Sequence, residues 1–275
     1  MRIEKNLRRS RERGRKSLII YITAGDPDLK VTEELVYSIA DAGADVVELG
    51  IPFSDPLADG PTIQQASQRA LKGKVTISKI LSTIERIRKK SSVPIALMTY
   101  YNPIFYYGLD RFVADSKKIG VDGLIVPDLP LEESKELRAI TERFGIELIP
   151  FITPTTTSER IEAITKVAQG FIYCVSVTGV TGIRENLSLD VAEMIRKIRP
   201  YTDVPLAIGF GISNTKQAKE MIKYSDAIIV GSAVIKIIEN YQNDLATMLS
   251  QVKDFVRSLK KAITTEERRK NRIKT

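Results

Sequence analysis

Glu48 is the first residue whose type and position suggest chemistry. It lies inside the apolar segment 45–50, where a carboxylate is costly to bury unless it is paired, hydrogen-bonded or protonated. If Val47 and Leu49 pack outward, strand alternation points Glu48 into a cavity, where its pKa can rise enough for proton exchange near neutrality. The alternative is a structural ion pair with a neighbouring strand. None of the predicted strands contains lysine or arginine, so we favour a catalytic role.

A second carboxylate, Asp59, follows eleven residues later in a loop, 52–61, that prolines stiffen and a glycine allows to turn. This loop could hold Asp59 so that it faces Glu48. An aspartate before glycine is equally often a turn residue that bonds its own backbone, so the residues alone leave both roles open. Asp26 and Asp128 also lie at strand ends, and for these two we expect turn or helix-cap roles.

The composition excludes several other chemistries. The 275 residues include no histidine, so no imidazole can act as a base or metal ligand, and the single cysteine, Cys174, can form neither an internal disulfide nor a multi-cysteine metal site. A Schiff-base aldolase needs a lysine at the end of a strand, and the predicted strands have none. An all-oxygen metal site remains open in principle, but no ligand cluster is apparent. We therefore expect proton transfer by carboxylates, with no metal and no cofactor in this chain.

Eight apolar segments of strand length recur along the chain, without alternation and rich in Val and Ile. They are residues 18–23, 45–50, 95–100, 123–128, 147–153, 171–176, 206–211 and 227–232. Such runs are typical of parallel strands covered on both faces, and the intervening segments have helical spacing. Eight βα units predict an α/β fold, a single (β/α)8 TIM barrel. The runner-up, a doubly wound open sheet, is disfavoured because no G-x-G-x-x-G turn follows the first strand.

Glycine-containing turns follow three of these strands, at 179–182, 209–213 and 231–232. Backbone N–H groups in such turns, and at the starts of the helices that follow, can approach phosphate oxygens. In a (β/α)8 barrel the loops after the last two strands are the usual phosphate site. One glycine pair alone would fit a tight turn, but three at successive strand ends indicate that the substrate is a phosphorylated small molecule.

The net charge of +8 is concentrated at the two ends of the chain. Residues 1–16 and 253–275 carry +6 each, which leaves −4 for the body, a poor match to a nucleic-acid groove. No apolar run reaches the roughly 18 residues of a membrane span. We therefore expect a cytoplasmic protein that binds neither nucleic acid nor membrane. Ile3 and Leu7 predict a short N-terminal helix that closes one end of the barrel. We expect one barrel domain, 1–262, and a mobile basic tail, 263–275.

Longer stretches of the sequence resemble one known family. They are ELGIPFSDPLADGPTIQ at 48–64, YITAGDP at 21–27, DLPLEES at 128–134, GVTG at 179–182, GFGIS at 209–213 and GS at 231–232. Together they are similar to the tryptophan synthase alpha chain family over nearly the whole chain, except for the tail beyond about residue 262.

The resemblance implies a barrel enzyme that cleaves indole-3-glycerol phosphate to indole and glyceraldehyde 3-phosphate by a retro-aldol reaction in tryptophan biosynthesis. It implies no cofactor in this chain, and a PLP-dependent beta chain as partner in an alpha2beta2 complex. Glu48 would move protons between the glycerol hydroxyl and indole C3. Asp59 would accept a hydrogen bond from the indole N–H and stabilise the charge that develops there.

The resemblance also implies contacts around the substrate. Tyr173 would lie beside it, Tyr100 and Tyr21 would line the indole pocket, and Thr181 would position Asp59 when a loop closes. The phosphate cradle and its neighbours would be Gly182, Phe210, Gly211, Gly231 and Ser232. Many relatives carry phenylalanine at the position of Tyr21, so the added hydroxyl needs a partner or water. The long loops after the second and sixth strands would form the lid and the partner contact.

Two other classes remain as alternatives. Another phosphate-binding barrel enzyme, such as an isomerase or indole-glycerol-phosphate synthase, would share the glycine turns but not the run at 48–64, and such a synthase would also need a lysine in the barrel. The non-enzymatic alternative is a scaffold whose basic ends bind RNA or an acidic partner, which a salt-sensitive gel shift would reveal.

Overall fold

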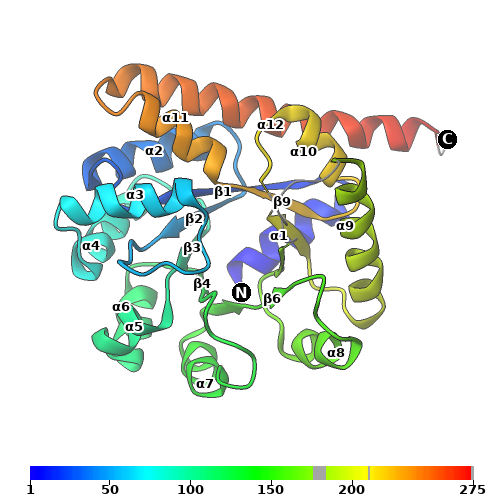
Figure 1. Ribbon diagram of the computed structural model, residues 1–275, viewed down its shortest axis with the longest axis horizontal. Helices are drawn as coiled ribbons and strands as arrows, with labels where there is room; N and C mark the ends of the chain where they lie inside the picture. The colour runs from blue at the N-terminus through cyan, green and yellow to red at the C-terminus, as the bar shows by residue number, and fades with distance from the viewer. Residues whose placement is uncertain (176–183, 210, 274–275) are drawn as a thin grey trace.

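A ring of parallel strands surrounded by helices forms the protein (Figure 1). The computed structural model describes the backbone of residues 1–175, 184–209 and 211–273. The strands are β1 Ser17–Thr23, β2 Val46–Gly50, β3 Ile95–Met98, β4 Gly123–Ile125, β5 Glu147–Ile149, β6 Phe151–Ile152, β7 Ile172–Val175, β8 Leu206–Gly209 and β9 Ala227–Val230. Their order is β5-β4-β3-β2-β1-β9-β8-β7-β6, and every pairing is parallel.

The predicted eight-stranded barrel is confirmed, with one strand divided in two. β5 pairs with β4, β6 pairs with β7, and only Pro150 separates β5 from β6. The Pro150 carbonyl accepts a hydrogen bond from the Tyr173 N–H at 2.9 Å, but proline has no N–H to donate in return. The segment from β5 to β6 therefore pairs with β4 on one side and with β7 on the other, so the ring continues across Pro150. The alternative fold, a doubly wound open sheet, is wrong.

Helices cover the outside of the ring. They are α1 Arg2–Glu12, α2 Leu29–Asp41, α3 Pro61–Lys72, α4 Ile77–Arg88, α5 Tyr101–Tyr107, α6 Leu109–Lys118, α7 Lys135–Phe144, α8 Ser158–Val167, α9 Arg184–Ile198, α10 Thr215–Met221, α11 Ser232–Asn240 and α12 Leu245–Ile273, with a 3₁₀ turn at Arg199–Tyr201. Local signals fix several starts: Asp28 accepts from the N–H groups of Lys30 and Val31, and α3 begins with Pro61 directly after Gly60.

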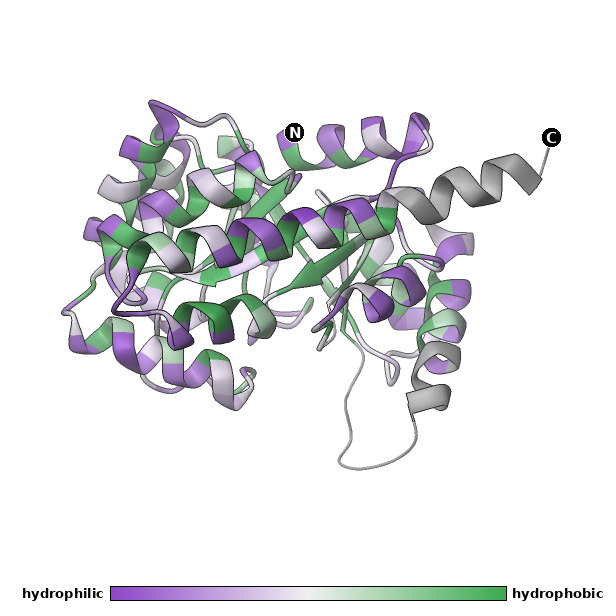
Figure 2. Cartoon of the chain, turned by 90° about the horizontal axis from the view of Figure 1, so that it is seen from above, coloured by the Kyte–Doolittle hydropathy of each residue, from purple (hydrophilic) through white to green (hydrophobic). Residues whose placement is uncertain are grey.

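The core has two layers, one inside the ring and one between the strands and the helices. Figure 2 shows hydrophobic strands, in green, surrounded by helices that also carry hydrophilic residues, in purple. Val46 belongs to the cluster inside the ring, whereas Val47 and Leu49 belong to the larger cluster between strands and helices. Because side chains alternate along a strand, Glu48 shares the inner face with Val46. The predicted orientation of this strand is thus confirmed.

Helix α1 closes the N-terminal end of the ring, as predicted. Ile3 and Leu7 are buried and join the inner cluster. The carboxylate of Glu147 accepts hydrogen bonds from the N–H groups of Ile3 and Glu4, both at 2.9 Å. These are donors at a helix start that no residue of the helix itself can satisfy. A buried acid at the start of β5 therefore caps α1 from outside the helix.

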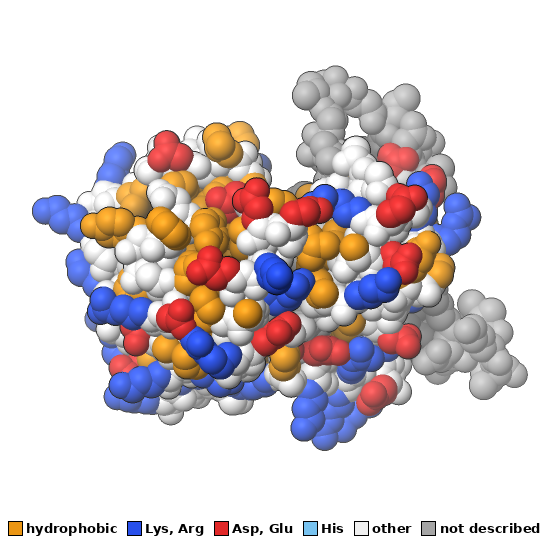
Figure 3. Space-filling model, turned by 90° about the horizontal axis from the view of Figure 1, so that it is seen from below, with side chains coloured by type: hydrophobic (Ala, Val, Ile, Leu, Met, Phe, Trp, Pro, Cys, Tyr) orange, Lys and Arg blue, Asp and Glu red, His pale blue; other side chains and the backbone are white. Residues whose placement is uncertain are grey.

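The surface mixes charges of both signs. On the face shown in Figure 3, lysines and arginines lie among acidic residues, with hydrophobic side chains between them. Helix α12 continues through the boundary predicted at residue 262, and Ile263 is buried. The division into a barrel and a tail stays a prediction. Among the helices that the structure describes, none is long and apolar enough to cross a membrane.

Candidate active site

A cavity of about 400 Å³ opens where the strands end at their carboxyl side. Its lining includes Glu48 of β2, Gly209 of β8 and Ile229 of β9, together with Asp59 from the loop after β2 and Ser232 at the start of α11. The C-terminal face is where (β/α)8 enzymes carry their active sites, because eight loops converge there on a rigid ring.

Glu48 is fully buried in this cavity. It lies between Tyr21 of β1 and Ala96 of β3 in the strand register. Within the described part of the chain, neither of its carboxylate oxygens has a hydrogen-bond partner. Burial, with a smaller contribution from the charge of Asp59, raises the pKa of Glu48 to about 8. A carboxyl group in this state is protonated at neutral pH and can still release its proton.

Asp59 lines the same cavity from the loop after β2. Its backbone is fixed by two hydrogen bonds: its N–H donates to the Pro56 carbonyl at 3.0 Å, and the Gln64 side-chain amide donates to its carbonyl at 2.8 Å. Burial raises the pKa of Asp59 to about 6, against a hydrogen bond from Tyr100 that lowers it. Asp59 is therefore both a turn residue and an acid that faces the cavity, and it is mainly ionised at pH 7.

Two of the predicted tyrosines pack directly against glycines. A side-chain carbon added at Gly50 would lie 2.2 Å from the Tyr21 hydroxyl, and one at Gly209 would lie 2.3 Å from the Tyr173 ring. Both rings therefore occupy space that only glycine leaves free, and both line the cavity. The extra hydroxyl of Tyr21 has a partner, the hydroxyl of Thr23 at 3.3 Å.

Tyr100 contacts the loop that carries Asp59, and the indole contact that the resemblance implies for it stays a prediction. It is buried but is not among the residues that line this cavity. Its hydroxyl accepts a hydrogen bond from the Ala58 N–H at 2.9 Å and donates to the carboxylate of Asp59. In this structure Tyr100 thus supports the loop that carries Asp59.

The predicted phosphate end lines the same cavity and is only partly described. Gly211 has φ +44° and open space around it, and Gly231 and Ser232 sit at the start of α11. The N–H groups of Ser232 and Ala233 have no acceptor within their helix, as at every helix start, and they favour an anion. Thr181, Gly182 and Phe210 lie outside the described residues.

The other strand-end acids have structural roles, and one differs from expectation. Asp128 accepts from the N–H of Tyr101 at 2.9 Å and so caps α5, a helix-cap role as predicted. We expected the Asp26 side chain to bond its own turn or to cap a helix. Instead, both of its carboxylate oxygens accept hydrogen bonds from Arg69. Sequence reasoning missed Arg69. No local pattern could have revealed it, because it lies 43 residues from Asp26 in the chain.

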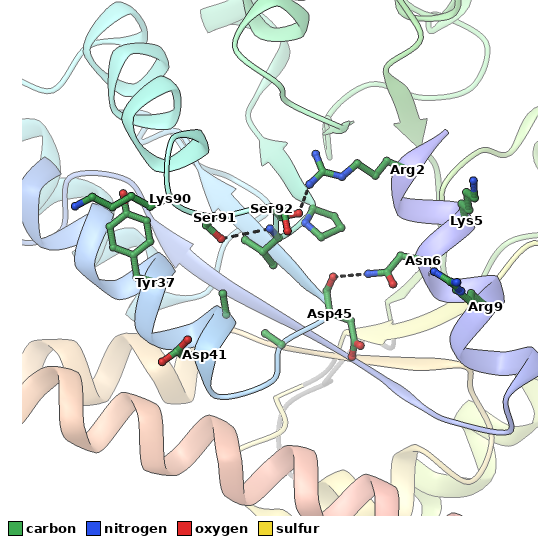
Figure 4. Close-up of a pocket in the computed structure, with 14 residues that line it drawn as sticks. Arg2, Lys5, Asn6, Arg9, Tyr37, Asp41, Asp45, Lys90, Ser91 and Ser92 are labelled. Atoms are coloured by element: carbon green, nitrogen blue, oxygen red, sulfur yellow. Dashed lines mark hydrogen bonds between the residues drawn. The ribbon is translucent and has the colours of Figure 1, made fainter.

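A larger cavity, of about 720 Å³, lies at the opposite end near α1 (Figure 4). Its walls carry the cationic side chains of Arg2, Lys5, Arg9 and Lys90. Asp45, which also lines it, is held by Lys260 at 2.5 Å. This cavity lies at the face that stabilises such barrels, so the smaller cavity with the two carboxylates is the candidate active site.

The architecture is that of a (β/α)8 enzyme, with buried acids in a cavity at the carboxyl ends of its strands. The described residues include no group of three or more His, Cys, Asp or Glu side chains that could hold a metal ion.

Comparisons with known proteins give the family. The model of the family described as "Tryptophan synthase alpha chain" matches residues 7–264. A tryptophan synthase alpha chain from Thermoanaerobacter sp. (strain X514) is 50% identical over 262 residues, which cover 95% of this chain and 99% of the relative. One from Geobacter sp. (strain M21) is 49% identical over 92% of this chain and 94% of the relative.

Comparisons with solved structures support the same family. The tryptophan synthase alpha chain from Legionella pneumophila subsp. pneumophila has a TM-score of 0.87 at 34% identity, covering 95% of this chain and 97% of that chain. A ligand-free tryptophan synthase from M. tuberculosis has a TM-score of 0.86 at 29% identity, covering 96% and 99%. The chain therefore belongs to the tryptophan synthase alpha chain family, and it is a lyase of tryptophan biosynthesis.

Proposed function

We propose that this chain cleaves indole-3-glycerol phosphate to indole and glyceraldehyde 3-phosphate by a retro-aldol reaction, without a cofactor of its own. The observation that carries the proposal is that Glu48, Asp59 and the start of α11 line one cavity. Two acids in different protonation states face a site suited to an anion. That combination fits a neutral ring on one side of the substrate and a phosphate on the other.

Glu48 moves the proton in this mechanism. Protonated at neutral pH, its carboxyl group donates to indole C3, which becomes tetrahedral and leaves a positive charge on the ring. The resulting carboxylate then takes the proton of the glycerol hydroxyl next to the ring. The bond between indole C3 and that glycerol carbon breaks, and its electrons return to the ring. The products are neutral indole and an aldehyde, and the proton has moved from oxygen to carbon through Glu48.

Asp59 stabilises the charged intermediate. Its carboxylate is mainly ionised at pH 7 and accepts a hydrogen bond from the indole N–H, which becomes more acidic when C3 is protonated. Burial raises the pKa of Tyr21 and Tyr173, so both hydroxyls stay neutral at physiological pH. Their rings form apolar walls that exclude water from the ring of the substrate.

The phosphate binds at the other end of the cavity in this proposal. The N–H groups at the start of α11, which have no acceptor within their own helix, and the open space at Gly211 support it. By family resemblance Gly182 and Phe210 belong to the same end and Thr181 positions Asp59, although all three lie outside the described residues. Binding of the phosphate at this end places indole C3 beside Glu48, so the binding free energy is used to orient the substrate for reaction.

We further propose that the partner is a PLP-dependent beta chain in an alpha2beta2 complex. Two exposed hydrophobic side chains support a partner contact: Leu57, on the loop that carries Asp59, is 94% exposed, and Tyr106, on α5, is 93% exposed. Apolar groups so fully in water are favourable to cover. A partner that covers Leu57 would also hold Asp59 in place.

One assay tests the activity. The purified chain is mixed with indole-3-glycerol phosphate, and indole release is followed with and without beta chain. We expect slow release alone and faster release with the partner. Glu48→Gln should abolish release while leaving the affinity for glycerol 3-phosphate near wild type, and the exposed Glu133→Gln should behave as wild type. Full activity of Glu48→Gln would falsify the mechanism.

A further inference from the structure

One arginine links three segments around the candidate site. Arg69 of α3 donates to both carboxylate oxygens of Asp26, from Nε at 2.8 Å and from Nη2 at 2.9 Å. Its remaining nitrogen, Nη1, donates to Glu239 of α11 at 2.8 Å. The Asp26 side chain is 1% exposed, that of Arg69 19% and that of Glu239 39%. The network is largely buried, and it uses all three nitrogens of the guanidinium group.

The helices that Arg69 joins both begin at the cavity. α3 starts at Pro61, two residues after Asp59, and α11 starts at Ser232, at the proposed phosphate end. The two helices pack against each other (Figure 1). At about 1.5 Å per residue, the network lies roughly 10–15 Å along each helix from the residue that faces the cavity. Because a helix is stiff over this length, a contact that fixes one of its turns also fixes the position of its first residue.

Other ion pairs of the barrel lack this connection. Arg86 of α4 binds Glu33 of α2 at 3.0 Å, and neither helix starts at, or directly after, a residue that lines the cavity. The Asp26–Arg69–Glu239 network alone, among the described ion pairs, joins the helix that follows Asp59 to the helix that begins at the proposed phosphate end. Its geometry is fixed, because a bidentate contact restrains both distance and angle.

We propose that Arg69 is a positioning residue, which holds Asp59 and the phosphate end of the cavity at the separation that the substrate spans. The inference rests on the proposed function. Without the network each end can still bind its own part of a ligand, but the two ends lose their fixed spacing. The loss then falls on ligands that contact both ends and on the reacting geometry, where a displacement of about 1 Å can cost about 100-fold in rate.

The test compares Arg69→Gln and Arg69→Lys with Glu239→Ala, and uses Arg86→Gln as a control that removes an ion pair between two other helices, α4 and α2. For each full-length variant, in complex with beta chain, kcat and KM for indole release are measured. Affinities are measured for glycerol 3-phosphate, which reaches one end, and for indole-3-propanol phosphate, a non-cleavable analogue that spans both. Circular dichroism gives the folded fraction.

We expect Arg69→Gln to lower kcat at least tenfold and to weaken the spanning analogue about tenfold, with glycerol 3-phosphate within threefold of wild type. Arg69→Lys, which cannot make the fork, should lie closer to Arg69→Gln than to wild type. Glu239→Ala should lower kcat three- to tenfold, and Arg86→Gln should change neither constant. If Arg69→Gln does not fold because Asp26 is left buried without a partner, Glu239→Ala decides, since that side chain is partly exposed.

Folded variants with wild-type kcat and an unchanged ratio of the two affinities overturn the inference, even if their melting temperatures fall. If the wild type releases no indole, the proposed function fails. The ratio of the two affinities then still shows whether Arg69 sets the spacing, because binding needs no turnover.

Discussion

Burying Glu48 without a partner has a stability cost that can be measured. Its pKa rises from 4.5 to about 8 because the ionised form is poorly solvated inside the barrel. At about 1.4 kcal/mol per pKa unit, ionising Glu48 in the folded protein is about 5 kcal/mol more costly than in the unfolded chain. Replacing it with glutamine removes this cost. The glutamine amide is also buried without hydrogen-bond partners, which lowers the free energy of unfolding of the variant by about 1–2 kcal/mol.

The sign of the pH dependence follows from the direction of this shift. Between pH 4.5 and about 8 the folded protein holds a proton on Glu48 that the unfolded chain has released. Stability contributed by this group therefore falls as pH rises through that window, and is constant above it. We expect Glu48→Gln to match the wild type within about 1 kcal/mol at pH 5. By pH 8.5 the variant should be the more stable by about 3 kcal/mol.

Urea denaturation at both pH values, without ligand, measures the difference between the two proteins. Other groups that titrate in this range, such as Glu147, are present in both and largely cancel. The exposed Glu133→Gln should follow the wild type at both pH values. A gap between wild type and Glu48→Gln that does not change with pH would refute the claim that burial, without a partner, sets the pKa of Glu48.

Three more predictions test single contacts. Gly209→Ala puts a carbon 2.3 Å from the ring of Tyr173, so kcat/KM for indole release should fall at least tenfold. The far-ultraviolet circular dichroism spectrum should stay that of the wild type. An unchanged kcat/KM would show that the ring moves freely. Glu147→Gln weakens the cap on α1, so urea denaturation should show a loss of about 1–3 kcal/mol with kcat unchanged, and equal stability would contradict the role of the cap. Tyr21→Phe removes a 3.3 Å hydrogen bond to Thr23 and should change stability by less than about 1 kcal/mol, whereas a larger loss in thermal denaturation would mean that the hydroxyl has a further partner.

The barrel could be predicted from the sequence because parallel strands covered on both faces leave a continuous apolar pattern. That pattern located every strand that the structure describes, and its main error was to read residues 147–153 as one unbroken strand. Pro150 was the visible signal for the break, since a residue without an N–H cannot donate to a neighbouring strand. Strand ends were overextended elsewhere for a related reason: residues such as Tyr100 are apolar because the loops above the strands are buried as well.

The two acids could also be predicted, whereas their supporting contacts could not. Glu48 and Asp59 are unusual in their local setting, one inside an apolar strand and the other in a proline-rich loop. The residues that hold this arrangement are ordinary in theirs. Arg69 looks like any polar residue of a surface helix, and its partner Glu239 is 170 positions away. Contacts between distant segments depend on how the ring closes, and one sequence does not encode them as a pattern.

The absence of cations from the strands, noticed first as a negative result, is a condition for the proposed chemistry. A lysine or arginine next to Glu48 would stabilise its carboxylate and lower its pKa, so the group could no longer donate a proton at pH 7. Arg69 instead binds two carboxylates that do not line the cavity, Asp26 and Glu239. The barrel can therefore use arginine to hold its helices in place while Glu48 keeps its raised pKa, and the stability lost by burying Glu48 is the same free energy that keeps it protonated.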